Sequence, residues 1–326
     1  MDYEQFVADY TAQLQLNMEQ ENISIQRIET QKVNEMKDSL SIRYPDSPVA
    51  PTIHLQDEYE LVLDGYTVEE LAERKAEQLS SIRSNAPEVP ELTPESAKKN
   101  LYCVVINAEA NEELLKQVPH EKLEDLAVIP RFKVGEDGSF IVKNEMCQHL
   151  QMTSEEVMEQ AHKNTEKQNF ECQNMTEVMR GIMKEQGMPD EYVDELLQMQ
   201  GESCPMYVMS NESRVEGAVA LTSTAAMDSA YEKIKEDHPD MENLFVLGSS
   251  RHELILIPDD AVDNVEDLKA IHKEVQDTEL SKADKLTEHI YKFDAQSKKL
   301  SIADAPVLEK GESMAMEVVK SHARSH

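Results

Sequence analysis

Residues 244–258, LFVLGSSRHELILIP, form the most hydrophobic stretch of the chain. Two aliphatic runs, 244–247 and 254–257, flank a short polar tip at 248–253. Apolar runs of this length, separated by a turn rich in Gly and Ser, are typical of a buried β-hairpin. The sequence therefore predicts that this hairpin is the centre of the main sheet.

Further hairpins are predicted along the chain. They pair 126–134 with 139–143 around Gly135-Glu136-Asp137-Gly138, 205–210 with 217–221 around 211–216, and 289–293 with 299–302. A single strand is expected at 101–107, and no βαβ unit with a Gly-rich turn is present. Consecutive hairpins with helices packed on them predict an α+β fold with a mostly antiparallel sheet, not a doubly wound α/β fold.

Helices are predicted from caps and apolar periodicity. Residues 2–19 place Phe6, Tyr10, Leu14 and Met18 on one face of a helix. A capping box at Thr67 and Glu70 predicts the start of another helix, whose buried side is formed by Val68, Leu71, Ala72, Leu79 and Ile82. Other helices are expected from 93, through 153–199 with a stop at Gly187, over 223–235 and 264–275, and briefly from 281. Met and Leu dominate the apolar faces of 153–199, and this pattern favours core filling over a binding groove.

The domain organisation is predicted from composition. A smaller N-terminal domain of mixed helix and strand is expected at 1–88, with short strands near 23–28, 39–44 and 51–55. The segment 85–94 holds three prolines and reads as a linker. The main α+β domain is expected at 95–303, followed by a flexible tail at 304–326.

The charge balance limits the possible partners. The chain has 65 acidic and 32 basic side chains, a formal net charge of -33. Such a field repels nucleic-acid backbones and anionic membranes, and it is suited to attracting a basic protein partner or to imitating nucleic acid. The favoured interpretation is simply a soluble acidic cytoplasmic protein. No secretory signal or membrane-spanning apolar window is found, and the four cysteines are far apart, so a cytoplasmic protein with reduced thiols is expected.

Four stretches resemble an uncharacterised bacterial family, a domain of unknown function associated with gut anaerobes and their mobile elements. They are Val105-Ile106-Asn107 with Glu109, Asn111, Leu114, Leu115, Val118, Pro119 and His120; Asp125-Leu126-Ala127-Val128; Pro205-Met206-Tyr207-Val208 to Asn211 with Gly217-Ala218; and Ser249-Ser250 with His252-Glu253. The similarity keeps its order over most of 55–303. Gly248 stands where the family pattern has Pro, and Arg251 where it has an aliphatic residue. The resemblance implies a fold unit and carries no activity.

The hairpin tip is the only place where Ser, His and Glu crowd together, so Ser249, Ser250, His252 and Glu253 are candidate hydrolase residues. If the tip is extended, Ser250 and His252 lie on one face and Glu253 on the other, which prevents a relay. The Gly that a nucleophile elbow requires two residues after the Ser is also missing. The favoured interpretation is structural: a Ser hydroxyl bonds turn amides, and His252 with Glu253 tethers a neighbouring helix.

A second group of polar residues is a candidate functional patch. Asn107, Glu109 and Asn111 alternate at a strand end near His120, and Asn211 ends a later strand. These residues either line a pocket or cap the sheet edge and the next helix, and capping is favoured.

Motifs for metals and cofactors are missing. The residue four after His252 is Leu256, so the zincin helix pattern is absent, and no P-loop, dinucleotide-binding or calcium-loop spacing occurs. The sequence therefore predicts no metal and no cofactor. It favours a non-enzymatic cytoplasmic interaction or regulatory protein, acting through its acidic surface or a Met-lined groove. The alternative is a hydrolase-like enzyme built on the 249–253 tip.

Overall fold

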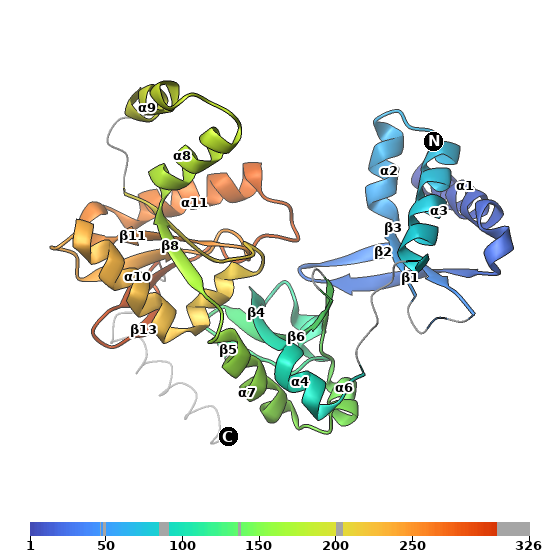
Figure 1. The fold of residues 1–326 in the computed structure, drawn as a ribbon, viewed down its shortest axis with the longest axis horizontal. Helices are drawn as coiled ribbons and strands as arrows, with labels where there is room; N and C mark the ends of the chain where they lie inside the picture. The colour runs from blue at the N-terminus through green and yellow to red at the C-terminus, as the bar shows by residue number, and fades with distance from the viewer. Residues whose placement is uncertain (46, 48–49, 85–90, 136–137, 200–204, 305–326) are drawn as a thin grey trace, which may run out of the picture. The chain divides into compact units, whose positions relative to one another are not determined.

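The structure is a computed structural model that describes residues 1–45, 47, 50–84, 91–135, 138–199 and 205–304 (Figure 1). Much of the predicted linker at 85–94, Cys204 and nearly all of the predicted tail lie outside the described residues. Three mostly antiparallel sheets and their helices confirm the predicted α+β class. No described helix is both long and apolar enough to cross a membrane.

The chain divides into two compact units. The first comprises Met1–Lys122, Ala127–Thr165 and Ser281–Ala283, and the second comprises Leu123–Leu126, Glu166–Leu280 and the described residues from Asp284 on. The first unit contains two of the sheets, except for the end residues Leu123 and Leu126 of the second, and the six-stranded sheet belongs to the second unit.

The first sheet has the order β1-β2-β3, formed by β1 (Ser24–Lys32), β2 (Glu35–Arg43) and β3 (Thr52–His54). Three helices accompany it: α1 (Tyr3–Asn17), α2 (Leu55–Leu63) and α3 (Val68–Ser84). The predicted face of α1 is confirmed, because Phe6, Tyr10, Leu14 and Met18 are buried in one core with Leu40 and Ile42. The capping box at Thr67 and Glu70 is also present. Ile82, predicted to be buried, is 52% exposed because it lies in the last turn of α3.

The second sheet has the order β4-β6-β5, with β7 paired to β6. Its strands are β4 (Leu101–Asn107), β5 (Glu121–Leu123), β6 (Leu126–Val134) and β7 (Gly138–Ile141). The helices around it are α4 (Pro94–Asn100), α5 (Glu112–Leu115), α6 (Asn144–Leu150) and α7 (Ser154–Thr165). The predicted β6–β7 hairpin is confirmed, and so are the helix starts at Thr93 and Thr153.

The third sheet has the order β13-β12-β10-β11-β9-β8. Its strands are β8 (Phe170–Asn174), β9 (Tyr207–Asn211), β10 (Asn243–Leu247), β11 (Leu254–Pro258), β12 (Ile290–Asp294) and β13 (Lys299–Ile302). The helices are α8 (Met175–Glu185), α9 (Asp190–Met199), α10 (Thr224–Asp237) and α11 (Val265–Glu279), with 3-10 helices η1 (Glu19–Glu21), η2 (Gly217–Thr222) and η3 (Asp259–Ala261) along the chain. β10 and β11 form a hairpin in the middle of the sheet, as predicted, and Leu244 lies opposite Pro258.

Three predicted elements of the second half are wrong. β8 interrupts the predicted helical block, because Phe170–Asn174 pairs along β9. A segment of five residues is too short for its own hydrophobic period to distinguish a strand from a helix. Residues 217–221 form part of η2 instead of a strand; they are all buried, and a short apolar run does not distinguish the two. The predicted helix from 281 is a turn, because backbone groups of 284–287 bond the hairpin tip instead.

Candidate functional site

The tip of the central hairpin is a folded loop held by backbone bonds on both sides. The carbonyls of Gly248 and Ser249 accept from the amides of Thr287 and Leu286. On the other side, the carbonyl of His252 accepts from the amide of Gly217 at 3.0 Å and from Ser210 Oγ at 2.7 Å. The loop is therefore fixed by the segments before η2 and after α11.

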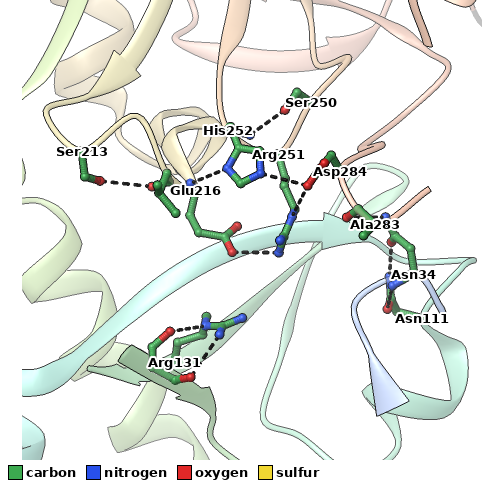
Figure 2. A network of polar contacts seen from close by, with 12 residues as sticks. Asn34, Asn111, Arg131, Ser213, Glu216, Ser250, Arg251, His252, Ala283 and Asp284 are labelled. Atoms are coloured by element: carbon green, nitrogen blue, oxygen red, sulfur yellow. Dashed lines mark hydrogen bonds and ion pairs between the residues drawn. The ribbon is translucent and has the colours of Figure 1, made fainter. Parts of the chain in front are cut away.

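Four charged or ionisable side chains converge at this tip (Figure 2). Arg251 Nη1 donates to Glu216 Oε1 at 2.8 Å, and Arg251 Nε lies 3.6 Å from Asp284 Oδ1. His252 Nε2 lies 3.0 Å from the same Asp284 oxygen. The side chains of Arg251 and Glu216 are only 18% and 9% exposed, so the ion pair compensates charges that burial would otherwise make costly.

The tautomer of His252 follows from its partners. The amide of Glu216 donates to His252 Nδ1 at 3.2 Å, so this nitrogen holds a lone pair. The ring proton of the neutral imidazole is then on Nε2, which donates it to Asp284. Both ring nitrogens are engaged in the structure.

The serines predicted as nucleophiles do not contact this imidazole by their hydroxyls. Ser250 is buried, and its Oγ accepts from the amide of His252 at 3.0 Å, which is the turn-amide bond that the sequence suggested. Ser249 is half-buried, and its carbonyl also accepts from Gln276 Nε2 at 3.3 Å. Glu253 is exposed and has no hydrogen bond or ion pair with a described residue, whereas the carboxylate bonded to His252 is that of Asp284.

Gly217 permits the close approach of the two segments. A Cβ at this position would lie 2.1 Å from Ser210 Oγ and 2.4 Å from the carbonyl oxygen of His252. Both distances are far below van der Waals contact. Only glycine fits between β9 and the hairpin tip here.

The second predicted patch is divided between the two units. In the first unit, Asn111 is buried and pairs with Asn34 at the turn of the β1–β2 hairpin (Figure 2). Asn111 Nδ2 donates to Asn34 Oδ1, and Asn111 Oδ1 accepts from the Asn34 amide, both at 2.8 Å. Asn107 Oδ1 accepts from the amide of Ala110 at 2.8 Å. These amide groups order the β4–α5 turn and the β1–β2 turn.

The other members of that patch have local partners. Glu109 and His120 are exposed, and His120 Nδ1 lies 3.1 Å from the carbonyl oxygen of Val118. Asn211 belongs to the second unit, where its Nδ2 donates to the Val215 carbonyl at 2.8 Å. Sequence reasoning missed Asn34, Glu216 and Asp284, because none of them lies near its partner in the chain.

No three His, Cys, Asp or Glu side chains in the described part of the chain are arranged to hold a metal ion. Burial raises the pKa of Cys103 to about 12 and that of Cys172 to about 11, and it also raises the pKa of Cys147. Thiolates are the form that binds metals and attacks electrophiles. These three thiols therefore stay protonated at neutral pH.

The helices α8 and α9 expose an apolar face. On α8 the spacing i, i+3, i+4, i+7, i+8 aligns Met175, Val178, Met179, Ile182 and Met183, yet no side chain of α8 is fully buried. Ile182 is 44% exposed, and Tyr192 on α9 is 52% exposed. Core filling, which the sequence favoured for these methionines, is therefore wrong for α8: its apolar face is left half-covered.

Ion pairs fix the two helices to each other. Arg180 of α8 pairs with Asp194 of α9, and Lys184 Nζ lies 3.0 Å from Asp190 Oδ1. These pairs use both cations of residues 175–199. The other carboxylates of this helix pair have no ion pair with a described residue: Glu177, Glu185, Glu191 and Glu195. A half-covered apolar face therefore lies on an acidic helix pair.

Comparison with known protein families identifies a match. A family model described as "Family of unknown function (DUF5688)" matches residues 3–295, nearly the whole chain. No curated protein and no solved structure matches it.

Proposed function

The chain belongs to the family of unknown function DUF5688, and from this premise we propose that it is a non-enzymatic interaction protein of the bacterial cytoplasm. It regulates or assists a basic protein partner by binding an amphipathic helix of that partner. The observation that carries this proposal is the half-covered apolar face of α8, which lies on an acidic helix pair.

The chemistry of the α8–α9 surface selects the partner. Methionine side chains are flexible and polarisable, so a face with Met175, Met179 and Met183 adapts to differently shaped apolar side chains. The uncompensated carboxylates around it favour lysine and arginine at the rim of the contact. An amphipathic helix with a basic polar face offers both features, and helix-in-groove recognition uses such anchors.

The net charge of the whole chain supports the same partner class. At -33 the field attracts a basic segment from a distance and repels phosphate backbones and anionic lipid.

The hydrolase alternative has less support. His252 Nδ1, the ring nitrogen with the lone pair, already accepts the Glu216 amide, and no serine hydroxyl of the described residues donates to it. A general base needs a lone pair within reach of the proton that it removes. The bonds around His252 fit a structural role.

The proposal is tested with a fluorescent synthetic peptide of about 18 residues, made of Leu and Lys with leucines at the helical spacing i, i+3, i+4, i+7. We expect binding by fluorescence anisotropy. A peptide of the same composition with a scrambled order should bind much more weakly, because it lacks a continuous apolar stripe. Raising the salt concentration should weaken binding, since exposed charges more than about 10 Å apart are screened at about 0.1 M.

The variant Ile182→Asp places a carboxylate in the apolar face and should lower the affinity by about tenfold, or about 1.4 kcal/mol. Leu63→Asp is the matched control, because Leu63 is 67% exposed at the end of α2, in the other unit. Equal binding of the ordered and scrambled peptides would contradict recognition of a helix. Binding that Ile182→Asp leaves unchanged would place the contact elsewhere, and no binding of either peptide would overturn the proposal.

A further inference from the structure

Strand β1 has an open edge. It is the outer strand of the first sheet, and β2 is the only described strand with which it pairs. No backbone group on its other side is bonded to a residue that the structure describes. An exposed strand edge is a template on which another strand can pair.

The pairing register of β1 with β2 identifies the β1 residues whose backbone amide and carbonyl groups point to the free edge. Ile42 on β2 donates its amide to the carbonyl of Pro51 at 2.9 Å, on the β3 side and away from β1. Its partner across the β1–β2 ladder is Ile25, which therefore directs its own amide and carbonyl to the free edge. Since these directions alternate along a strand, the same holds for Arg27, Glu29 and Gln31.

A groove of about 510 Å³ opens between α1 and this strand. Its lining combines apolar side chains, Val7, Ala8 and Ala12 from α1 and Ile25 and Leu40 from the sheet, with the polar side chains of Glu4, Thr11, Gln15 and Arg27. The ion pair of Arg27 with Glu4 lines this groove, and the small side chains of Ala8 and Ala12 on α1 leave the rest of it open, so the side chains of an added strand have room there.

The sequence of β1 is complementary to itself. If two copies of β1 run antiparallel with Ile28 opposite Ile28, Arg27 of each copy lies opposite Glu29 of the other. Opposite charges across a ladder stabilise the pairing. Shifting the centre by one residue places Arg27 opposite Arg27, or Glu29 opposite Glu29, so charge selects the Ile28 register.

The hydrogen bonds agree with that register. Arg27 and Glu29 both direct their backbone groups to the free edge, so each Arg27–Glu29 pair across the copies is a hydrogen-bonded pair. Gln26 is opposite Thr30, and Ile25 is opposite Gln31. Glu29 has no ion pair with a described residue of its own chain, so its carboxylate is available to the second copy.

We propose that a second copy of this chain adds its β1 to this edge, and that the two copies form one continuous six-stranded antiparallel sheet across a two-fold axis centred on Ile28. The strand order across the dimer is β3-β2-β1-β1-β2-β3. Such an interface is isologous, because the same residues contribute from both copies. The proposal does not depend on the α8–α9 surface.

The test uses two charge reversals on the full chain, with molar mass measured by size-exclusion chromatography with light scattering. The wild type should be a dimer at micromolar concentration. Glu29→Arg places cations opposite cations, and Arg27→Glu places carboxylates opposite carboxylates, so each variant alone should be a monomer. An equimolar mixture should recover the dimer mass, because every Arg then faces a Glu.

Arg27→Glu also removes the ion pairs of Arg27 with Glu4 and Asp38 in its own chain, at 2.8 and 2.6 Å. Glu29→Arg breaks no such pair and is the decisive single variant; recovery in the mixture shows that both variants are folded. A monomeric wild type, or a dimer that Glu29→Arg leaves intact, would overturn the proposal.

Disulfide trapping tests the register independently. In a non-hydrogen-bonded pair the Cα atoms are about 4.5 Å apart, within the range that a disulfide spans. Ile28→Cys should therefore form a cross-linked dimer under mild oxidation. Gln26→Cys is the matched control, since Gln26 faces Thr30 in this register and should not cross-link. Cross-linking through position 26 but not 28 would refute the Ile28 register.

Discussion

His252 and Asp284, 32 residues apart in the chain, are joined by a hydrogen bond of 3.0 Å between Nε2 and Oδ1. The other ring nitrogen of His252 accepts the amide of Glu216. One imidazole thus joins the hairpin tip to the loop before η2 and to the segment after α11. The tip that looked like a catalytic cluster in the sequence is a joint between three segments.

We expect His252→Ala to lower the free energy of unfolding by about 1–3 kcal/mol, because it leaves the amide of the buried Glu216 without an acceptor. Thermal and urea unfolding measure the change. Ser250→Ala should also destabilise, since it removes the acceptor for the His252 amide.

Glu253→Ala is the control for these variants, because Glu253 is exposed and its side chain has no hydrogen bond or ion pair with a described residue. Its melting temperature should match that of the wild type. Unshifted melts for both His252→Ala and Ser250→Ala would contradict the structural role and revive the hydrolase alternative.

Gly217→Ala should destabilise the protein by about 3 kcal/mol, because overpacking displaces either Ser210 or the hairpin tip. Gly181→Ala is the matched substitution on α8, where an added Cβ meets nothing within 4 Å. It should stabilise by about 0.5–1 kcal/mol, because alanine restricts the unfolded chain and favours helix. Equal effects of the two variants would show that the close approach at Gly217 does not constrain the fold.

His272 on α11 should make stability depend on pH. His272 is 1% exposed, and neither ring nitrogen makes a well-formed hydrogen bond with a described residue; the backbone of Glu288 favours the charged ring only weakly. Burial lowers its pKa to about 4, although the carboxylates of Asp304 and Glu288 favour the charged form. The unfolded chain therefore binds a proton near pH 6.5 that the folded chain accepts only near 4, so stability falls as the pH drops through that interval.

The expected loss from His272 is about 2 kcal/mol between about pH 7 and about pH 5, from urea unfolding at each pH. His272→Leu should largely abolish this dependence, because leucine fills the site without a titrating group. His149→Leu is the control, since His149 is exposed and its removal also deletes one histidine. An unchanged pH dependence in His272→Leu would refute the assignment.

The three buried thiols should resist alkylation in the native state. In a Cys204→Ser background, Cys103, Cys147 and Cys172 should react slowly with iodoacetamide at neutral pH and rapidly in urea, because burial raises the pKa of all three. Mass spectrometry of quenched samples counts the modified thiols. Rapid labelling of any of them without urea would contradict the burial seen in the structure.

Local signals predicted much of the fold. The aliphatic runs of β10 and β11, the face of α1 through Phe6 and Tyr10, and the capping box at Thr67 all appear where the sequence indicated. Each depends on residues within a few positions of one another. Where the signal was short or uniformly apolar, as in β8 and η2, tertiary contacts decided the element.

The candidate site was only half visible in the sequence. Ser250 and His252 drew attention because they are only two residues apart, but the partners of Arg251 and His252, which are Glu216 and Asp284, come from segments about 30 to 40 residues away. No local pattern links such residues, and the tautomer of His252 depends on the Glu216 amide.

The sequence by itself determined the central hairpin, the α+β class, the acidic charge and the family, because periodicity, composition and motif order are properties of the chain. Only the tertiary structure decided that α8 leaves its methionines half-covered, that β1 has an open edge and that His252 bonds Asp284. The physical reason is that burial and hydrogen-bond partners depend on which segments meet, and long-range packing sets those meetings.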